Sequence, residues 1–150
     1  MIKMSALSFF LFFACGVPSS AQGLQVDLEL VLAVDVSRSM NAAEAKLQRE
    51  GYVAALSNPA FTSAIEDGML GRIAVTYVEW AGHFSQRVAV DWFVIDSAEA
   101  ALGFAKRVGE NSPGSARGTS ISGVLDFGAG KIRDNAFDGL RKVIDVSGDG

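Results

Sequence analysis

Apolar runs of strand length alternate along this chain with amphipathic runs of helical length. Residues 28–35 are apolar except for Glu29 and the final aspartate, which is typical of a strand buried on both faces of a parallel sheet. Two further runs, residues 73–80 and 88–95, are rich in β-branched and aromatic residues and are joined by a short connection. We therefore predict that these two strands are antiparallel to each other. A last strand is predicted over residues 143–146.

Helix-start signals precede the amphipathic runs. Asn41 followed by Glu44 is a capping-box pattern, and Asp96 followed by Glu99 repeats it. Asn58, which stands before a proline, is a further start signal. The sequence therefore predicts four helices, over residues 41–56, 59–68, 96–108 and 120–131.

The order of the predicted elements favours an α/β fold. Because the first strand is apolar throughout and helices separate most of the strands, we expect a doubly wound, mostly parallel sheet with one antiparallel edge strand. Ligands of such sheets bind at the carboxyl ends of the strands. Asp35 ends the first predicted strand, Asp149 follows the last one, and residues 110–118 form a loop rich in Gly, Ser, Pro and Asn. A binding site is therefore expected at this edge of the sheet.

Residues 1–21 have the order of an export signal. Lys3 supplies the positive start, residues 6–17 form the apolar stretch, and Ala21 ends a small-residue cleavage site. The apolar run is shorter than the roughly 20 residues that a membrane span needs. We therefore expect cleavage after Ala21, export to the periplasm or the extracellular space, and no transmembrane segment in the mature chain. Lipoprotein processing at Cys15, inside the signal, is the alternative.

The composition limits the class of fold and function. The 150 residues fit one domain, over residues 22–150 after removal of the signal, and 49% of them are hydrophobic, as in an ordinary globular protein. The net charge of −4 gives no basic surface of the kind that nucleic-acid binding requires, so we expect no nucleic-acid partner. Removal of the signal with its cysteine leaves neither a disulfide nor a thiolate metal site.

Oxygen-bearing side chains occupy alternate positions where the first predicted strand ends. Asp35 is the last residue of this strand, and Ser37 and Ser39 lie between it and a predicted helix. Mg²⁺ prefers oxygen ligands and usually keeps several waters, so one carboxylate and two hydroxyls supply part of a shell that a ligand from elsewhere can complete. The alternative is a polar strand-to-helix turn whose hydroxyls cap backbone amides.

Three separate segments of the chain together resemble the metal-ion-dependent adhesion site of the von Willebrand factor type A domain, also known from the inserted domains of integrins. Asp35, Ser37 and Ser39 match the Asp-x-Ser-x-Ser motif of that family, Thr119 matches its loop threonine, and Asp149 matches its final aspartate. The resemblance implies that the serines and the threonine bind Mg²⁺ directly, while the aspartates act largely through water. Mn²⁺ and Ca²⁺ are alternatives to Mg²⁺.

The resemblance covers residues 25–150, roughly the first two thirds of the domain in that family. There, further helices and two more strands follow the final aspartate, whereas this sequence stops at Gly150. We therefore expect a Rossmann-like sheet that is incomplete at the C-terminus. Residues 77–82 and 143–150 look like a branch of secreted bacterial proteins with this domain and no established activity, so the resemblance implies a fold and a site rather than a specific role.

Two functions are compatible with these residues. The first is an exported, non-catalytic binding or adhesion module, whose Mg²⁺-type site recruits a carboxylate of a protein partner. The alternative is a Mg²⁺-dependent phosphohydrolase of the haloacid dehalogenase type, with Asp35 as nucleophile and a Gly-Asp-Gly motif at residues 148–150. That chemistry needs a second acid two residues after the nucleophile. Ser37 occupies this position, so we favour the binding module.

Four other residues are interpreted as structural. His83 is the only histidine, which excludes a three-histidine zinc site, and we interpret it as a solvated loop residue. We expect Trp80 and Trp92 to pack under helices rather than to form an aromatic binding patch. Asp145 lies inside the last predicted strand, where a structural role is expected.

Overall fold

The computed structural model describes residues 23–148, and the predicted export signal and Asp149 lie outside the described residues. The elements follow one another in the order β1 (Leu24–Asp35), α1 (Ala42–Leu56), α2 (Pro59–Glu66), β2 (Ile73–Trp80), β3 (Gln86–Ile95), α3 (Ala98–Glu110), α4 (Ile121–Arg133) and β4 (Phe137–Ser147). In this part of the chain, no helix combines the length and the apolar character that crossing a membrane requires.

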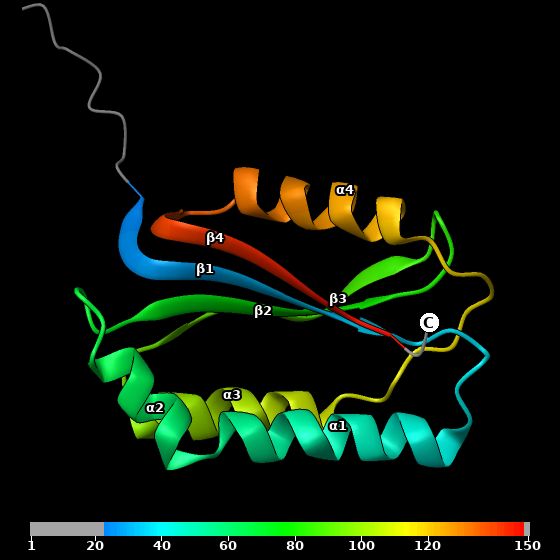
Figure 1. The fold of residues 1–150 in the computed structure, drawn as a ribbon, viewed down its shortest axis with the longest axis horizontal. Coiled ribbons are helices and arrows are strands. Elements are labelled where there is room, and N and C mark those ends of the chain that lie inside the picture. The colour runs from blue at the N-terminus through cyan, green and yellow to red at the C-terminus, as the bar shows by residue number, and fades with distance from the viewer. Residues whose placement is uncertain (1–22, 149–150) are drawn as a thin grey trace, which may run out of the picture.

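The four strands form one sheet in the order β3-β2-β1-β4. β1 is parallel to both of its neighbours, β2 and β4, and β3 is antiparallel to β2. The predicted α/β fold with one antiparallel edge strand is therefore confirmed (Figure 1). Because β1 has a partner on each side and a layer of helices on each face, its residues 31–35 are all buried.

Helices cover both faces of the sheet. α4 lies on one face, and α1, α2 and α3 lie on the other (Figure 1). Successive side chains of a strand point to opposite faces, so β2 contributes to two separate cores. Val78 and Trp80 pack with Val124 of α4. Val75 packs with Phe104 of α3 in the larger core on the opposite face.

Capping side chains set the starts of the helices. Asn41 and Glu44 form the predicted capping box at α1, in which Glu44 Oε2 accepts a hydrogen bond from the Asn41 amide at 2.8 Å. The predicted cap at Asp96 is wrong. Ser97 is the N-cap of α3, because its hydroxyl accepts a hydrogen bond from an amide of the first turn at 3.2 Å. α3 also continues through Gly109, since a single glycine weakens a helix without ending it.

β1 and β4 are both longer than the apolar pattern predicted. β1 begins at Leu24 rather than at residue 28, and β4 begins at Phe137 rather than at residue 143. Leu24 is paired with Phe137 in the parallel register. The backbone pairing therefore extends β4 through residues 137–142, whose side chains show no strand periodicity.

The connection between α3 and α4 must cross an end of the sheet, because these helices lie on opposite faces (Figure 1). This crossing segment, residues 111–120, is hydrogen-bonded to the residues that follow β1 and β2. The parallel strands β1, β2 and β4 all end there. In open α/β sheets this is the edge at which ligands bind.

Candidate metal centre

The turn after β1 gathers the side chains of the first motif. Asp35, the last residue of β1, is 1% exposed, and its Oδ1 accepts a hydrogen bond from the Ser37 amide at 2.7 Å. The Oγ atoms of Ser37 and Ser39 are 2.7 Å apart and share a hydrogen bond. Ser37 is buried and Ser39 is exposed. The turn therefore brings a carboxylate and two hydroxyls into one local cluster that reaches from the core to the surface.

Backbone hydrogen bonds attach the crossing segment to this turn. The Arg38 amide donates to the Ala116 carbonyl at 3.0 Å, and the Ala116 amide donates to the Val36 carbonyl at 3.2 Å. The result is a short parallel bridge between Ser37 and Ala116. Two loops that are far apart in the sequence are thus held in a fixed register at the carboxyl edge of the sheet.

Thr119 follows three residues after this bridge and lies at the end of β2. Gly118 has a φ of 85°, a left-handed conformation that favours glycine. The Ser120 amide donates to a carbonyl just after β2 at 2.9 Å, and a Cβ on Gly82 would lie only 2.6 Å from the Arg117 carbonyl oxygen. These contacts hold the backbone on both sides of Thr119 against the end of β2, and the Thr119 side chain is exposed.

The end of β4 reaches the same place. Ser147 is paired with Val34 of β1, and a Cβ on Gly148 would lie 3.1 Å from Oδ2 of Asp35. The chain therefore passes directly against the Asp35 carboxylate one residue before Asp149. Asp149 lies outside the described residues, so its role as a ligand stays a prediction.

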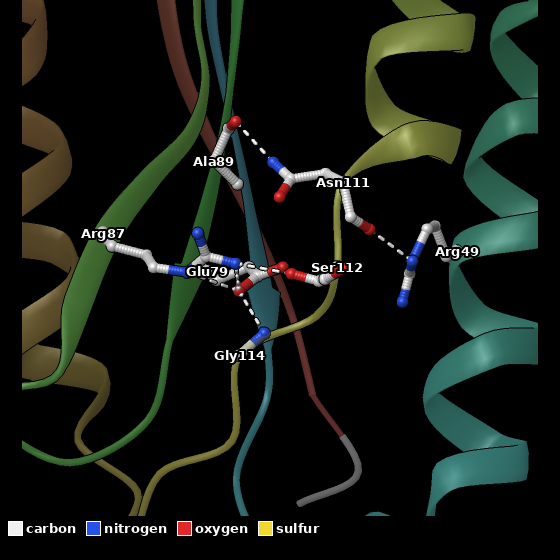
Figure 2. A network of polar contacts seen from close by, with 7 residues as sticks. All are labelled: Arg49, Glu79, Arg87, Ala89, Asn111, Ser112 and Gly114. Carbon is white, nitrogen blue, oxygen red and sulfur yellow. Dashed lines mark hydrogen bonds and ion pairs between the residues drawn. The ribbon is translucent and has the colours of Figure 1, made fainter.

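Three carboxylates are buried among residues 23–148, and they differ in their partners. Glu29 forms an ion pair with Lys142, and Glu79 forms one with Arg87 (Figure 2). Asp35 has no cationic partner among the described residues, where its one hydrogen-bond donor is a backbone amide. A buried charge without a compensating charge is costly. Asp35 is therefore the buried carboxylate that a bound cation would compensate.

The donor atoms of the cluster suit a hard divalent cation. Mg²⁺, Mn²⁺ and Ca²⁺ prefer oxygen ligands, and Asp35, Ser37 and Ser39 present such atoms within one turn. In the described part of the chain, no three His, Cys, Asp or Glu side chains form a group that could hold a metal. One Asp35 oxygen caps the Ser37 amide, and the hydroxyls of Ser37 and Ser39 form a hydrogen bond with each other.

Trp80 places an unsatisfied donor next to the cluster. It is the register partner of Asp35, and its Cζ2 would lie 3.4 Å from a Cβ on Gly148. Its indole N–H is buried and has no hydrogen-bond partner among the described residues. Because an unpaired buried donor costs free energy, this N–H is available to an acceptor in the surroundings of Asp35.

Tyr52 links α1 to the end of β4. Its hydroxyl donates to Ser147 Oγ at 2.8 Å. Burial is the main cause that raises the pKa of Tyr52; the hydrogen bond with Ser147 lowers it, and the nearby charge of Asp145 raises it. The net shift of the pKa is upward, so the hydroxyl remains a protonated donor at neutral pH. Asp145 is exposed on β4 and is a neighbour of this contact.

His83 and the tryptophans occupy the structural positions that were predicted. His83 is an exposed loop residue, and its Nδ1 lies 3.3 Å from Oγ of Ser120. The same hydroxyl is the N-cap of α4 and accepts a hydrogen bond from an amide of its first turn. Trp80 is buried, and Trp92 packs in the same core as Phe127 of α4, so both tryptophans lie under a helix.

Glu79 and Arg87 are polar residues of this edge that the sequence analysis did not single out. Besides its ion pair, Glu79 accepts a hydrogen bond from the Gly114 amide at 2.7 Å (Figure 2). The available signal was one charged position near the end of an otherwise apolar run, residues 73–80. Since a charge in a buried strand needs a partner, this position indicates a contact with another segment.

Comparison with known proteins identifies a family and a fold. The model of the family described as "Protein of unknown function (DUF1194)" matches residues 25–150. The chain is also similar to the von Willebrand factor domain of the type V pili tip protein Mfa5 from Porphyromonas gingivalis. The two share 16% sequence identity at a TM-score of 0.53, over 83% of this chain and 38% of that chain. This likeness shows the von Willebrand factor A fold.

A second solved structure contains three N-terminal domains of the same pili tip protein. It matches with 17% identity and a TM-score of 0.48, over 79% of this chain and 19% of that chain. The chain therefore spans less than half of the length of each of these two solved chains. No curated protein matches the sequence.

Proposed function

We propose that this chain, which belongs to the DUF1194 family, is an exported, metal-dependent binding module of the von Willebrand factor A type. Its site binds a divalent cation of the Mg²⁺ type and recruits a carboxylate of a protein partner. The observation that carries this proposal is the burial of Asp35 at the carboxyl edge of the sheet without a cationic partner among the described residues.

The residues of the edge have distinct tasks in this proposal. Asp35 supplies the negative charge that attracts the cation, and its hydrogen bond with the Ser37 amide fixes the orientation of the carboxylate. Ser37, Ser39 and Thr119 supply hydroxyl ligands, and Asp149 supplies a second carboxylate. The cation, when bound, provides a positive centre with a coordination position for an outside carboxylate. Charge-assisted contacts of this kind are stronger than neutral ones in a partly dry site.

The surface around the turn favours an acidic partner. Arg38 and Arg117 are exposed and lie on the two loops that the Ala116 bridge joins. Although the whole chain has a net charge of −4, the rim of the site thus carries positive side chains next to the cation position. Opposite charge on the partner would steer association toward this edge.

The surface at this edge is also hollowed. Two cavities, of about 210 and 250 Å³, share the lining residues Val36, Gly114 and Ser115. The larger cavity also borders Ser37. Side chains on either side of a partner's acidic residue would find room there.

The fold shown by the first of these comparisons is consistent with a role in binding. The chain shares its fold with the von Willebrand factor domain of a pili tip protein. By analogy we propose adhesion as the broad function of this chain and the cell exterior or periplasm as its location. Because one fold can support many functions, the proposed function rests on the residues of the metal centre rather than on the fold.

Calorimetric titration with Mg²⁺ and with Mn²⁺ tests the metal centre. The protein should bind either ion, and Asp35→Asn should abolish binding while its amide oxygen still accepts the hydrogen bond from Ser37. Asp126→Asn, on the exposed face of α4, is the matched control and should bind like the unchanged protein. Equal binding by all three proteins would show that the cation sits elsewhere.

Recruitment of a carboxylate is tested with poly-glutamate immobilised on a sensor surface. Binding should require Mg²⁺ or Mn²⁺ and should be lost with EDTA and with Asp35→Asn. The phosphohydrolase alternative makes the opposite prediction: hydrolysis of an aryl phosphate with Mg²⁺, with a phosphoryl group trapped on Asp35. Detection of that covalent intermediate would overturn the proposal.

A further inference from the structure

We infer that Glu79 is a positioning residue of the metal centre: with Arg87, it clamps the crossing segment at residues 112–114 and thereby holds Thr119 at the edge of the sheet. This inference rests on the proposed function. We assign Glu79 a supporting role rather than a ligand role, because its Oε2 accepts from Arg87 and Gly114 on the face of the sheet that carries α1 and α3.

The clamp is built around one buried oxygen atom. Glu79 is 3% exposed, and its Oε2 accepts hydrogen bonds from Arg87 Nε at 2.9 Å and from the Gly114 amide at 2.7 Å. Arg87 Nη2 lies 2.7 Å from the same oxygen and donates to the Ser112 carbonyl at 2.8 Å. Figure 2 shows these groups converging on the crossing segment from β2 and β3. One carboxylate thus joins two strands to the backbone of the loop.

Asn111, at the start of the crossing segment, extends the clamp. Its Nδ2 donates to the Ala89 carbonyl of β3, and its own carbonyl accepts a hydrogen bond from Arg49 of α1 (Figure 2). The first residues of the segment are therefore tied to β2, β3 and α1 through polar side chains.

Polar contacts matter here because the segment has little apolar packing. None of the residues 111–119 is buried, so burial of hydrophobic surface does not fix the path of the loop. Beyond the clamp, the bridge at Ala116 and the contacts of Gly118 and Ser120 hold the chain by backbone hydrogen bonds and close approach. Loss of the buried anchor would therefore leave the position of Thr119 to these backbone contacts alone.

Gly114 shows how closely the loop approaches the carboxylate. A Cβ at this position would lie 2.8 Å from Glu79 Oε2 and 3.3 Å from Arg87 Nε. Gly114→Ala would therefore push the loop away from the clamp without changing any charge. This substitution and the loss of the Glu79 charge should therefore both release the crossing segment from the clamp.

Glu29 offers a matched control at the opposite end of the sheet. It is 0% exposed, and it accepts hydrogen bonds from Asn135 Nδ2 at 2.6 Å and from the Gly139 amide at 2.7 Å, with Lys142 Nζ at 3.5 Å. Glu29 thus resembles Glu79 in burial and in its partners, but it holds the turn between α4 and β4. Glu29→Gln should destabilise the fold by a similar mechanism and leave the metal centre unchanged.

The test compares the full chain with Glu79→Gln, Gly114→Ala and Glu29→Gln. Two readouts are used below the unfolding temperature of every variant: the dissociation constant of Mn²⁺, and the rate of trypsin cleavage after the exposed Arg117 in EDTA. For Glu79→Gln and Gly114→Ala we expect Mn²⁺ binding weakened roughly 10–100-fold, as is typical when support of a metal ligand is removed, together with faster cleavage. Glu29→Gln should change neither readout.

Each outcome decides the inference. If Glu79→Gln behaves like Glu29→Gln in both readouts, Glu79 stabilises the fold and nothing more. Faster cleavage with unchanged Mn²⁺ affinity would show a clamp that does not position a ligand, which also overturns the inference. If the unchanged protein fails to bind Mn²⁺, the proposed function fails, and the positioning role falls with it; the cleavage rates would then report only whether the clamp holds the loop.

Discussion

The Arg38 amide donates a hydrogen bond to the Ala116 carbonyl at 3.0 Å, and this contact joins the turn after β1 to the segment that carries Thr119. It forms between two loops that cross the same edge of the sheet, because α1 begins after one loop and α4, on the opposite face, begins after the other (Figure 1). The topology of the fold therefore assembles the candidate site from residues that are distant in the sequence.

The two serine hydroxyls should each contribute to cation binding. Ser37→Ala and Ser39→Ala remove single oxygens from the cluster and should weaken Mn²⁺ binding by at least about tenfold, since even loss of a supporting contact often costs that much. Ser63→Ala, at an exposed position of α2, is the control. Unchanged titration curves for both site variants would show that neither hydroxyl is a ligand of the cation.

Packing of α4 on the sheet depends on a small residue at Gly128. A Cβ there would lie 2.9 Å from Cδ1 of Ile144, whereas a Cβ at Gly130 would meet only the flexible end of the Arg133 side chain, at 3.6 Å. Gly128→Ala should lower the free energy of unfolding by about 1–3 kcal/mol through overpacking. Gly130→Ala should leave it unchanged or raise it by up to about 1 kcal/mol. Urea denaturation measures both, and equal effects would contradict the packing of β4 under α4.

Alkaline pH should destabilise the fold through Tyr77. Its burial raises the pKa of the hydroxyl, and the negative charge of Glu79 raises it further. The folded state therefore keeps a proton that the unfolded chain loses near pH 10. This contribution to stability is complete below pH 10 and is lost as the pH rises toward the higher folded-state pKa, by roughly 1.4 kcal/mol per pH unit.

The measurement is the free energy of unfolding of the protein and of Tyr77→Phe between pH 8 and pH 11. The difference in stability between them should be constant up to pH 9 and should shift in favour of the variant above pH 10. Parallel curves over the whole range would show that Tyr77 titrates normally in the folded state.

Local signals in the sequence predicted most of the elements. The apolar run up to Asp35, the capping box of Asn41 and Glu44, and the strand over residues 73–80 are all present in the structure. In each case the signal lies in residues that are close in the sequence: the apolar pattern of a strand or the cap of a helix. The antiparallel pairing of β2 and β3 was also predicted from their short connection, because two parallel strands can be joined only by a much longer crossover.

These local signals did not predict the pairing between segments that are distant in the sequence. The first residues of β4, from Phe137 onward, have no strand periodicity, and they are extended because Leu24 and its neighbours pair with them. The clamp at Glu79 was missed for the same reason, since its partners Arg87 and Gly114 lie on other segments. In the candidate site, the spacing of the oxygen-bearing residues predicted the turn from Asp35 to Ser39. The position of Thr119, in contrast, depends on the path of the crossing segment over the end of the sheet.

The proposed metal centre requires that a divalent cation compensates the buried charge of Asp35. Thermal unfolding of the protein and of Asp35→Asn, each with EDTA and with excess Mg²⁺, measures this compensation. In EDTA the variant should be at least as stable, because it lacks an uncompensated buried charge. Mg²⁺ at a hundred times its dissociation constant should then stabilise the protein by about 2.7 kcal/mol and leave the variant unchanged. A variant that is less stable in EDTA, with no response of either protein to Mg²⁺ or Mn²⁺, would contradict the account.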